Sequence, residues 1–232
     1  MKLSRAHFIK ELESGLGTIY SFFADESIQI SELTDEVIKK AKSAGFEDKQ
    51  TYIVTKDTDW SFLNSENENF DLFGSKKIIE IKLIGTGPGN KGSKAIKDYC
   101  LDIDKDKLLI ISAERLEKKQ QTSAWAKVLE KSGIFVVEPP VNKDSMPGWI
   151  KARASGLKLN LNSQAIQLLS EKTEGNLLAV SHELTKLSLL FPDQEITLEN
   201  MEKSISNSSK FGIFDLSNSF LEGNRKRTIR II

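Results

Sequence analysis

Short apolar runs rich in β-branched and aromatic residues alternate with amphipathic segments between Thr18 and Glu138. Runs of this kind are typical of strands, whereas apolar residues that recur every three or four positions are typical of helices. The alternation predicts a doubly wound α/β domain. The predicted strands are Thr18–Phe23, Thr51–Thr55, Ile78–Leu83, Leu108–Ser112 and Ile134–Val137.

Apolar residues at helical spacing fill the interval between the first two strands and the interval between the last two. Glycine is a common stop signal for a helix, and Gly45 and Gly133 follow these two patterns. The apolar positions are Ile30, Leu33, Val37, Ile38 and Ala41 in the first interval, and Trp125, Val128 and Leu129 in the second.

Pro139 and Pro140 end the alternating pattern, because neither residue can donate a backbone hydrogen bond to a sheet. We therefore predict an α/β domain of residues 1–140 and a second domain of residues 141–210 that contains helices only. Apolar residues on one face of these helices indicate that they pack together in a small bundle. The predicted helices are Pro147–Ser155, Ser163–Thr173, Leu177–Leu190 and Leu198–Ile205.

Residues 211–232 begin a further helical pattern and end on two isoleucines, without a cap or a polar tail. We expect them to be the start of a third, truncated helical domain.

Composition excludes several classes of protein. The 232 residues include 33 basic and 33 acidic side chains, so no overall field attracts the chain to nucleic acid or to an anionic membrane. Cys100 is the single cysteine, and the sequence has no Cys/His cluster with metal-site spacing. No apolar run approaches the roughly 18 residues of a membrane span, so we expect a cytoplasmic protein without a membrane partner.

An α/β domain followed by a small helical domain is the outline of a nucleotide-binding motor, so the phosphate loop is the first candidate site. In such proteins the loop follows the first strand. Here that position holds Ala24–Ser27, which has no glycine, no lysine and two acidic residues, and which we interpret as the capping and first-turn residues of a helix.

The glycine-rich stretch Gly85–Lys94 has its lysine before the last glycine, as Lys91-Gly92-Ser93, which is the wrong order for a phosphate loop. We interpret this stretch as a flexible loop. No pair of acidic residues follows the strand Ile78–Leu83, and Glu114 stands alone after the next strand. We therefore expect neither ATP nor any other cofactor, no metal and no catalytic residue.

Phe70, Leu72 and Phe73 are large apolar residues in a polar surround. They can cap the core end of a short helix, or they can form an exposed cluster that binds in a pocket of a partner, because only clustered apolar residues on a surface indicate a binding site.

Several motifs in order along the chain favour the second interpretation. Together they resemble the delta subunit of the bacterial DNA polymerase III clamp loader, in its proteobacterial form. The motifs are Asp59-Trp60, Leu72-Phe73, Pro147–Ala154, Glu174–Ala179 continued by Glu183–Leu190, and Gly223.

The resemblance implies an AAA+ type α/β domain that has lost its ATP site, a three-helix lid domain and a helical collar domain that is mostly missing here. It implies a subunit that binds the beta sliding clamp and helps to open it for loading onto primed DNA. Such a subunit has no catalysis of its own, although it belongs to the DNA-directed DNA polymerase holoenzyme. The other implied partners are the gamma/tau and delta prime subunits, through the collar.

The resemblance also implies a clamp-binding element at residues 68–73, with Leu72 and Phe73 as an apolar plug and Phe70 beside them. Glu68 departs from the usual pattern, in which glutamine is common at this position. A carboxylate cannot donate the hydrogen bonds that a glutamine amide donates.

The sequence is also compatible with two alternative functions. The first is an active P-loop ATPase of the same architecture that uses Lys91 and Ser93. The second is a nucleic-acid-binding module, which would use a set of lysines and would bind DNA with a steep dependence on salt. Those lysines are Lys76, Lys77, Lys91, Lys94 and Lys97.

Overall fold

A computed structural model of the chain describes residues 1–68, 76–85, 87–173, 175–192 and 194–208, together with Leu221 and Gly223. Within these ranges, the side chains of Asn64, Asn67, Glu68 and residues 205–208 are not described. The chain forms two compact units, Met1–Pro140 and Val141–Ile232.

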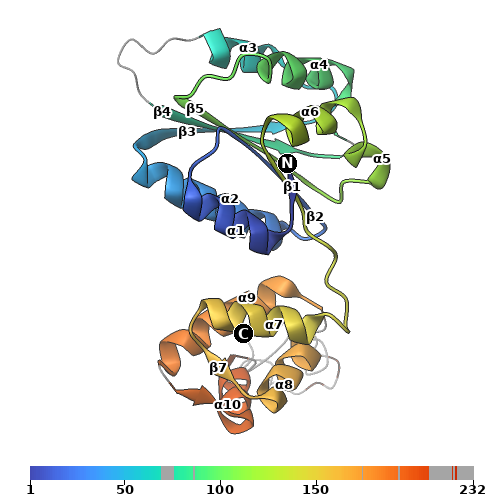
Figure 1. Cartoon of the computed structure of the whole chain (residues 1–232). Helices are drawn as coiled ribbons and strands as arrows, with labels where there is room; N and C mark the ends of the chain where they lie inside the picture. The colour runs from blue at the N-terminus through green and yellow to red at the C-terminus, as the bar shows by residue number, and fades with distance from the viewer. Residues whose placement is uncertain are drawn as a thin grey trace. The chain divides into compact units, whose positions relative to one another are not determined.

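The first unit is built on a parallel sheet of six strands (Figure 1). β2 lies between β6 and β5, although β3 and β4 come between β2 and β5 in the sequence. The strand order therefore reverses at β2, and crevices form at such a point outside the carboxyl ends of the strands. In spatial order the strands are β1 (Lys2–Leu3), β6 (Ile134–Val137), β2 (Ile19–Ala24), β5 (Lys107–Glu114), β4 (Lys76–Leu83) and β3 (Phe46–Val54).

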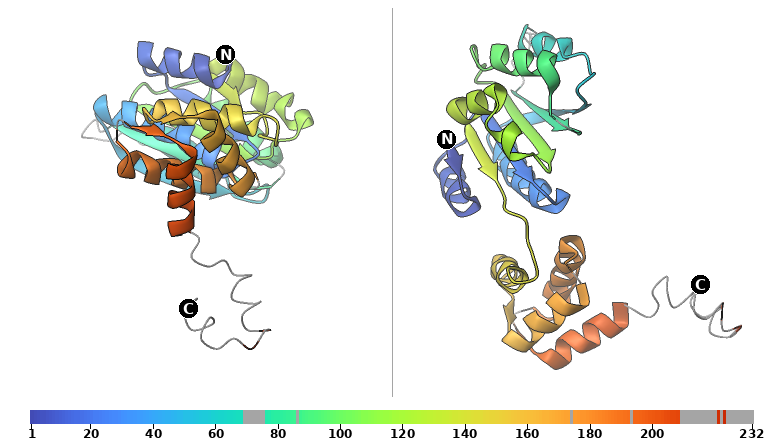
Figure 2. Two further views of the ribbon diagram at one scale, coloured as in Figure 1. Left: turned by 90° about the horizontal axis from the view of Figure 1, so that it is seen from below. Right: turned by 90° about the vertical axis from the view of Figure 1, so that its right-hand side faces the viewer.

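Helices cover both faces of this sheet, as Figure 1 and the right-hand view of Figure 2 show. α1 (Arg5–Ser14) and α2 (Ser27–Ser43) lie on one face. The other face carries α3 (Ser61–Glu68), α4 (Gly89–Tyr99) and α6 (Ala124–Ser132), and the short α5 (Lys118–Gln121) precedes α6.

Two hydrophobic cores result, one on each face of the sheet. On the α2 face, the ring centroids of Phe8 and Phe22 lie 5.3 Å apart in an edge-to-face contact. On the α4 face, the centroids of Phe23 and Phe135 lie 4.9 Å apart, and Trp125 packs beside them. Strands buried on both faces have nearly continuous apolar sequences, which explains why the central strands are clear in the sequence.

The second unit consists mainly of helices, and they pack through apolar faces. Leu177, Val180, Leu184 and Leu187 of α9 are buried, as their helical spacing predicts. The helices are α7 (Met146–Gly156), α8 (Ser163–Thr173), α9 (Leu177–Leu190) and α10 (Leu198–Ser208).

One feature of the second unit differs from the predictions. The prediction of helices only was wrong, because β7 (Asn160–Leu161) and β8 (Glu195–Ile196) form a short parallel pair. The described residues of this unit contain the four helices that the sequence pattern predicts, one more than the family resemblance implies for a lid domain.

All five predicted strands are present, but the predicted limits of β3 were wrong. β3 begins at Phe46, five residues before the predicted start at Thr51. It is an edge strand of the sheet, and its first half carries exposed polar side chains that give no apolar signal. Thr55 lies outside the strand, and its backbone N–H donates to the Thr58 hydroxyl at 2.8 Å.

The interpretation of Gly85–Lys94 as a flexible loop was wrong in its second half, because α4 begins at Gly89. The pair β1 and α1 at the start of the chain was not predicted. In the described part of the chain, no helix combines the length and the apolar character that a membrane crossing requires.

Candidate functional site

The turn before α3 is fixed by Asp59. Its carboxylate accepts hydrogen bonds from the backbone N–H of Ser61 at 3.2 Å and from the Ser61 hydroxyl at 2.6 Å. These hydrogen bonds hold the pKa of Asp59 below its usual value. An aspartate that bonds the backbone two residues ahead forms a local turn, and this one starts the helix.

Trp60 anchors the start of α3 to α4. Its side chain is buried and lies against Gly92 in the first turns of α4. A Cβ atom at Gly92 would lie 2.3 Å from Cε2 of the indole, so only glycine fits this contact. The Asp59-Trp60 motif therefore has a structural role, because it places α3 against the glycine-rich segment.

An aromatic stack connects α3 with β3. The rings of Tyr52 and Phe62 stack with their centroids 4.1 Å apart, and those of Phe62 and Trp60 lie 5.7 Å apart. Stacked aromatic pairs add about 0.5–1.5 kcal/mol to the free energy gained by burial. The stack fixes the orientation of α3 on the edge of the sheet.

Glu66, in the last turn of α3, makes the polar contacts that tie this helix to the sheet. Both carboxylate oxygens accept a hydrogen bond from Nζ of Lys77 in β4, each at 2.8 Å. The Tyr52 hydroxyl of β3 donates to Oε1 of the same carboxylate at 2.6 Å. We call these three residues, Tyr52, Glu66 and Lys77, the clasp.

The electrostatics of the clasp follow from its burial. The Glu66 side chain is 11% exposed and the Lys77 side chain 30%. Burial pushes the pKa of Glu66 upward, but the hydrogen bonds from Lys77 and Tyr52 and the charge of Lys77 outweigh it, so that pKa lies below its usual value. Burial, followed by the hydrogen bond to Glu66 and its charge, raises the pKa of Tyr52 to about 12. The clasp is therefore an ion pair with a neutral tyrosine at neutral pH.

The predicted clamp-binding residues lie next to the clasp in the sequence. Phe70, Leu72 and Phe73 lie outside the described residues. Glu68 is the last residue of α3, and its side chain is not described. The described chain ends at Glu68 and resumes at Lys76, so both flanks of this segment are defined by α3 and β4.

The carboxyl end of β2, where a phosphate loop would lie, has no phosphate-binding features among the described residues. Asp25 and Glu26 are exposed and precede α2. The predicted capping role was wrong for Glu26, which occupies the N-cap position without a side-chain hydrogen bond. The Ala24 carbonyl accepts a hydrogen bond from the backbone N–H of Arg115 at 2.8 Å, which joins the ends of β2 and β5.

A groove of about 710 Å³ opens beside α2 at this edge of the sheet, and three carboxylates and three cationic side chains line it. Glu80 is already paired with Lys49 at 2.8 Å and with Lys82 at 3.5 Å. The remaining acids, Asp35 and Glu114, oppose binding of a triphosphate.

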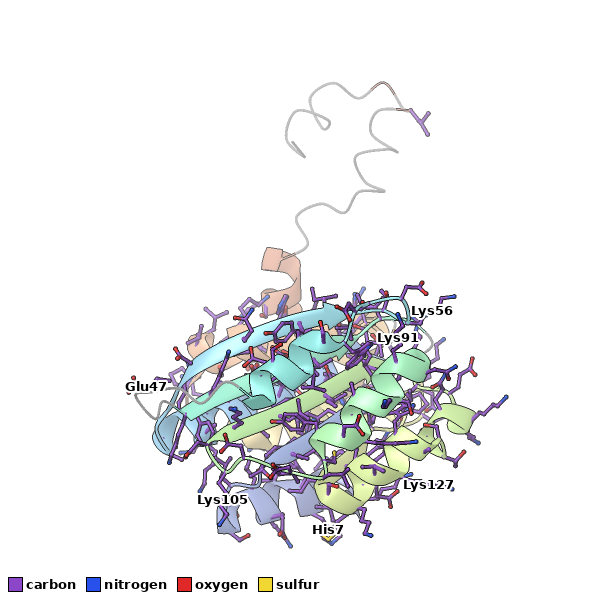
Figure 3. The ribbon with its side chains drawn as sticks, turned by 90° about the horizontal axis from the view of Figure 1, so that it is seen from above. His7, Glu47, Lys56, Lys91, Lys105 and Lys127 are labelled. Atoms are coloured by element: carbon purple, nitrogen blue, oxygen red, sulfur yellow. The ribbon has the colours of Figure 1, made fainter. Side chains whose placement is uncertain are left out.

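Lys91 and Ser93 lie on α4, which follows β4 rather than the first long strand. Gly89 has a φ of +67°, and a Cβ atom there would lie 3.0 Å from the carbonyl oxygen of Lys56, so this segment packs against the loop after β3. Figure 3 shows Lys56 and Lys91 at the carboxyl end of β3 and Glu47 at the opposite end of that strand. This geometry differs from that of a phosphate loop.

The structure separates the lysines of the predicted nucleic-acid module. Lys76 and Lys77 lie at the amino end of β4, whereas Lys91, Lys94 and Lys97 are spread along α4, in its first turn, its middle and its last turn. Nζ of Lys76 donates to the Ala44 carbonyl at 3.0 Å and lies over the ring of Phe46, while Lys77 pairs with Glu66. Lys76 and Lys77 are therefore engaged in contacts within the fold.

The clasp residues were not predicted from the sequence. Glu66 and Lys77 are eleven positions apart and lie in different elements, so no local periodicity links them. Tyr52 falls in a predicted strand, but the partner of its hydroxyl depends on how α3 packs. Among the described residues, no group of three or more histidine, cysteine, aspartate or glutamate side chains could hold a metal ion.

Comparison with known proteins identifies relatives across nearly the whole chain. The sequence profile of the family described as "DNA polymerase III, delta subunit" matches residues 20–138. DNA polymerase III subunit delta of Escherichia coli K12 is 30% identical over 222 residues, which are 96% of this chain and 65% of that protein. The subunit of the same name from Haemophilus influenzae is 29% identical over 227 residues, with 95% and 65% covered.

This chain therefore spans about 65% of the length of those two relatives. Among solved structures, the Bacillus subtilis DNA clamp loader delta protein has a similar fold, with a TM-score of 0.70 and 17% sequence identity. The match covers 97% of this chain and 69% of that one. The predicted fold class, a parallel α/β domain followed by a small helical domain, is confirmed.

Proposed function

We propose that this chain, which belongs to the DNA polymerase III delta subunit family, binds a ring-shaped sliding clamp and helps to open it for loading onto DNA. The observation that carries the proposal is the membership of the family, since the profile covers the α/β unit in which the segment 69–75 lies. The clamp-binding residues in this proposal are Phe70, Leu72 and Phe73, with Glu68 beside them.

The affinity comes mainly from apolar burial in this proposal. Burying each of the three apolar side chains in a pocket of the clamp contributes about 1.5–3 kcal/mol. Association costs at least about 4 kcal/mol in lost freedom and ordering, so three anchors alone give modest affinity. Polar contacts around the anchors then add specificity, and Glu68 takes part as an acceptor of hydrogen bonds.

Clamp opening follows if the chain binds an opened or strained clamp more tightly than a closed one. A ligand shifts a conformational equilibrium only by the difference between its affinities for the two states. We propose that this chain hydrolyses no ATP, which agrees with the acidic residues Asp25 and Glu26 at the end of β2. The energy for the loading cycle then comes from ATP on other subunits.

The remaining parts of the proposal concern the complex. Residues 1–140 form the clamp-binding domain, residues 141–210 the lid and residues 211–232 the start of a collar. Through the rest of the collar the full-length protein assembles with gamma/tau and delta prime subunits in the cytoplasm. Primed DNA is bound within that complex.

The double variant Leu72→Ala/Phe73→Ala tests the assignment of the site. We expect it to retain its circular dichroism spectrum and to lose binding to immobilised sliding clamp in surface plasmon resonance. The exposed pair Leu189→Ala/Leu190→Ala, at the end of α9 in the other unit, is a control of matched chemistry. The assignment is wrong if the Leu72/Phe73 variant binds as tightly as the unmodified chain.

A further inference from the structure

We propose that the clasp of Tyr52, Glu66 and Lys77 has a positioning role. It sets the separation between the two ends of residues 69–75, which we call the clamp-binding segment. This inference rests on the proposed function, because it assigns the clasp a role in clamp affinity. In this role the three residues do not contact the clamp. They act by holding the two flanks of the clamp-binding segment together.

The position of the clasp in the sequence supports this role. Glu66 lies two residues before the described chain ends at Glu68, and Lys77 lies one residue after it resumes at Lys76. The bidentate contact between their side chains therefore joins the two flanks of the segment directly. Among the described contacts, apolar packing, the Tyr52 hydroxyl and the charge of Lys107 would then remain to hold the end of α3 to the sheet.

Burial makes the clasp stronger than an ordinary surface ion pair. Exposed pairs contribute little, because water competes for both charges. Here the Glu66 side chain is 11% exposed, and it accepts hydrogen bonds from two different strands. Hydrogen bonds to charged groups in such sites are among the stronger ones in proteins.

Fixing the separation between the two ends of a chain segment reduces the number of conformations open to it. Fewer conformations before binding mean less entropy lost on binding, which is how preorganisation raises affinity. Breaking the clasp should therefore weaken clamp binding, although every apolar anchor is still present.

The same unit contains a matched control pair. Lys49 of β3 and Glu80 of β4 form an ion pair at 2.8 Å, and the Thr51 hydroxyl donates to Glu80 at 2.9 Å. This pair resembles the clasp, because a buried carboxylate accepts hydrogen bonds from a lysine and a hydroxyl, although Lys82 also lies 3.5 Å from that carboxylate. It joins β3 to β4, the two strands that supply Tyr52 and Lys77. It does not connect the end of α3 to the start of β4, the two flanks of the clamp-binding segment.

The experiment compares Lys77→Met and Glu66→Gln with the control Lys49→Met, and Lys77→Arg with the unmodified chain. Urea unfolding first measures the stability of each variant, and surface plasmon resonance then measures its dissociation constant for purified sliding clamp. We expect Lys77→Met and Glu66→Gln to bind about three- to tenfold more weakly, mainly through faster dissociation. Lys49→Met and Lys77→Arg should remain within about twofold of the unmodified chain.

The outcomes separate this inference from the proposed function. If the unmodified chain does not bind the clamp, both are overturned. If Leu72→Ala/Phe73→Ala binds as tightly as the unmodified chain, the site assignment and the role of the clasp are overturned, while clamp binding itself stands. If that double variant loses binding while Lys77→Met and Glu66→Gln bind normally, only the clasp is refuted. An equal loss of affinity in Lys49→Met also refutes it, because the effect would then come from general destabilisation.

Discussion

The contact between Gly92 and Trp60 gives the sharpest prediction about stability, because two effects of Gly92→Ala have opposite signs. Alanine in a helix is favoured over glycine by about 1 kcal/mol, so propensity alone predicts a more stable protein. The new Cβ atom, however, would lie 2.3 Å from Cε2 and 2.5 Å from Cζ2 of Trp60, and 2.7 Å from Cβ of Pro88. Favourable carbon contacts lie near 3.5–4.0 Å, so the ring or α4 must move by roughly 1 Å.

The Trp60 side chain cannot move freely, because it is 3% exposed and belongs to the core beneath α3 and α4. Overpacking a core typically costs about 1–3 kcal/mol. Because three contacts would be shorter than 3 Å, we expect a cost in the upper part of that range, about 2–3 kcal/mol. Subtracting the gain of about 1 kcal/mol in helix propensity, Gly92→Ala should lower the free energy of unfolding by roughly 1–2 kcal/mol.

Urea unfolding at 25 °C, followed by circular dichroism, measures this change. Gly148→Ala is the control, because Gly148 lies in the first turn of α7 and a Cβ atom there meets nothing within 4 Å. The control should be as stable as the unmodified chain, or more stable by up to about 1 kcal/mol. If Gly92→Ala is as stable as the unmodified chain, the account of α3 anchored through Trp60 is refuted.

Three further predictions follow from individual side chains. Burial pushes the pKa of Glu80 upward, but the hydrogen bonds from Lys49 and Thr51 outweigh this effect, so the pKa in the folded chain lies below its usual value. The ionised Glu80 therefore stabilises the fold fully above the ordinary glutamate pKa of about 4.3. This stabilisation is lost as the pH falls through the lower pKa of the folded chain. The stability of Glu80→Gln should therefore fall less steeply over that acid range than that of the unmodified chain, and equal slopes in urea titrations would contradict this. Burial raises the pKa of all three tyrosines, Tyr20, Tyr52 and Tyr99. At a pH of about 10, where an ordinary tyrosine is half ionised, absorbance should therefore show less tyrosinate in the folded chain than in the chain unfolded in urea, and equal amounts would contradict this. The Asn176 side chain accepts a hydrogen bond from the Ala179 N–H at 3.0 Å and caps α9. Asn176→Ala should therefore destabilise the second unit by about 1 kcal/mol in thermal unfolding, and an unchanged melting temperature would refute the capping role.

The sequence predicts most of the fold, because the central strands and amphipathic helices carry strong local signals. Ile134–Val137, Ser163–Thr173 and Leu177–Leu190 have the limits that the sequence predicts. The start of β3 is missed because an exposed edge strand needs no apolar face. The start of α4 is missed because its glycines are interpreted as a loop signal. Gly92 is needed instead to make room for the Trp60 indole, and such a tertiary contact leaves no local pattern in the sequence.

The candidate site could also be predicted only in part, because tertiary contacts leave no local pattern in the sequence. The sequence identifies Phe70, Leu72 and Phe73 as apolar residues in a polar surround and, through the resemblance, as a clamp-binding element. It gives no sign of the clasp, because the pairing of Glu66 with Lys77 exists only when α3 packs on the sheet. Lys77 was a candidate for DNA binding, and its ion pair with Glu66 now gives it a different role.

The central claim is that this chain binds a sliding clamp, and mixing the two purified proteins tests it most directly. We expect size-exclusion chromatography with light scattering to show a complex whose mass is the sum of the clamp and this chain. Two separate peaks, with no change in either mass at micromolar concentrations, would contradict the account.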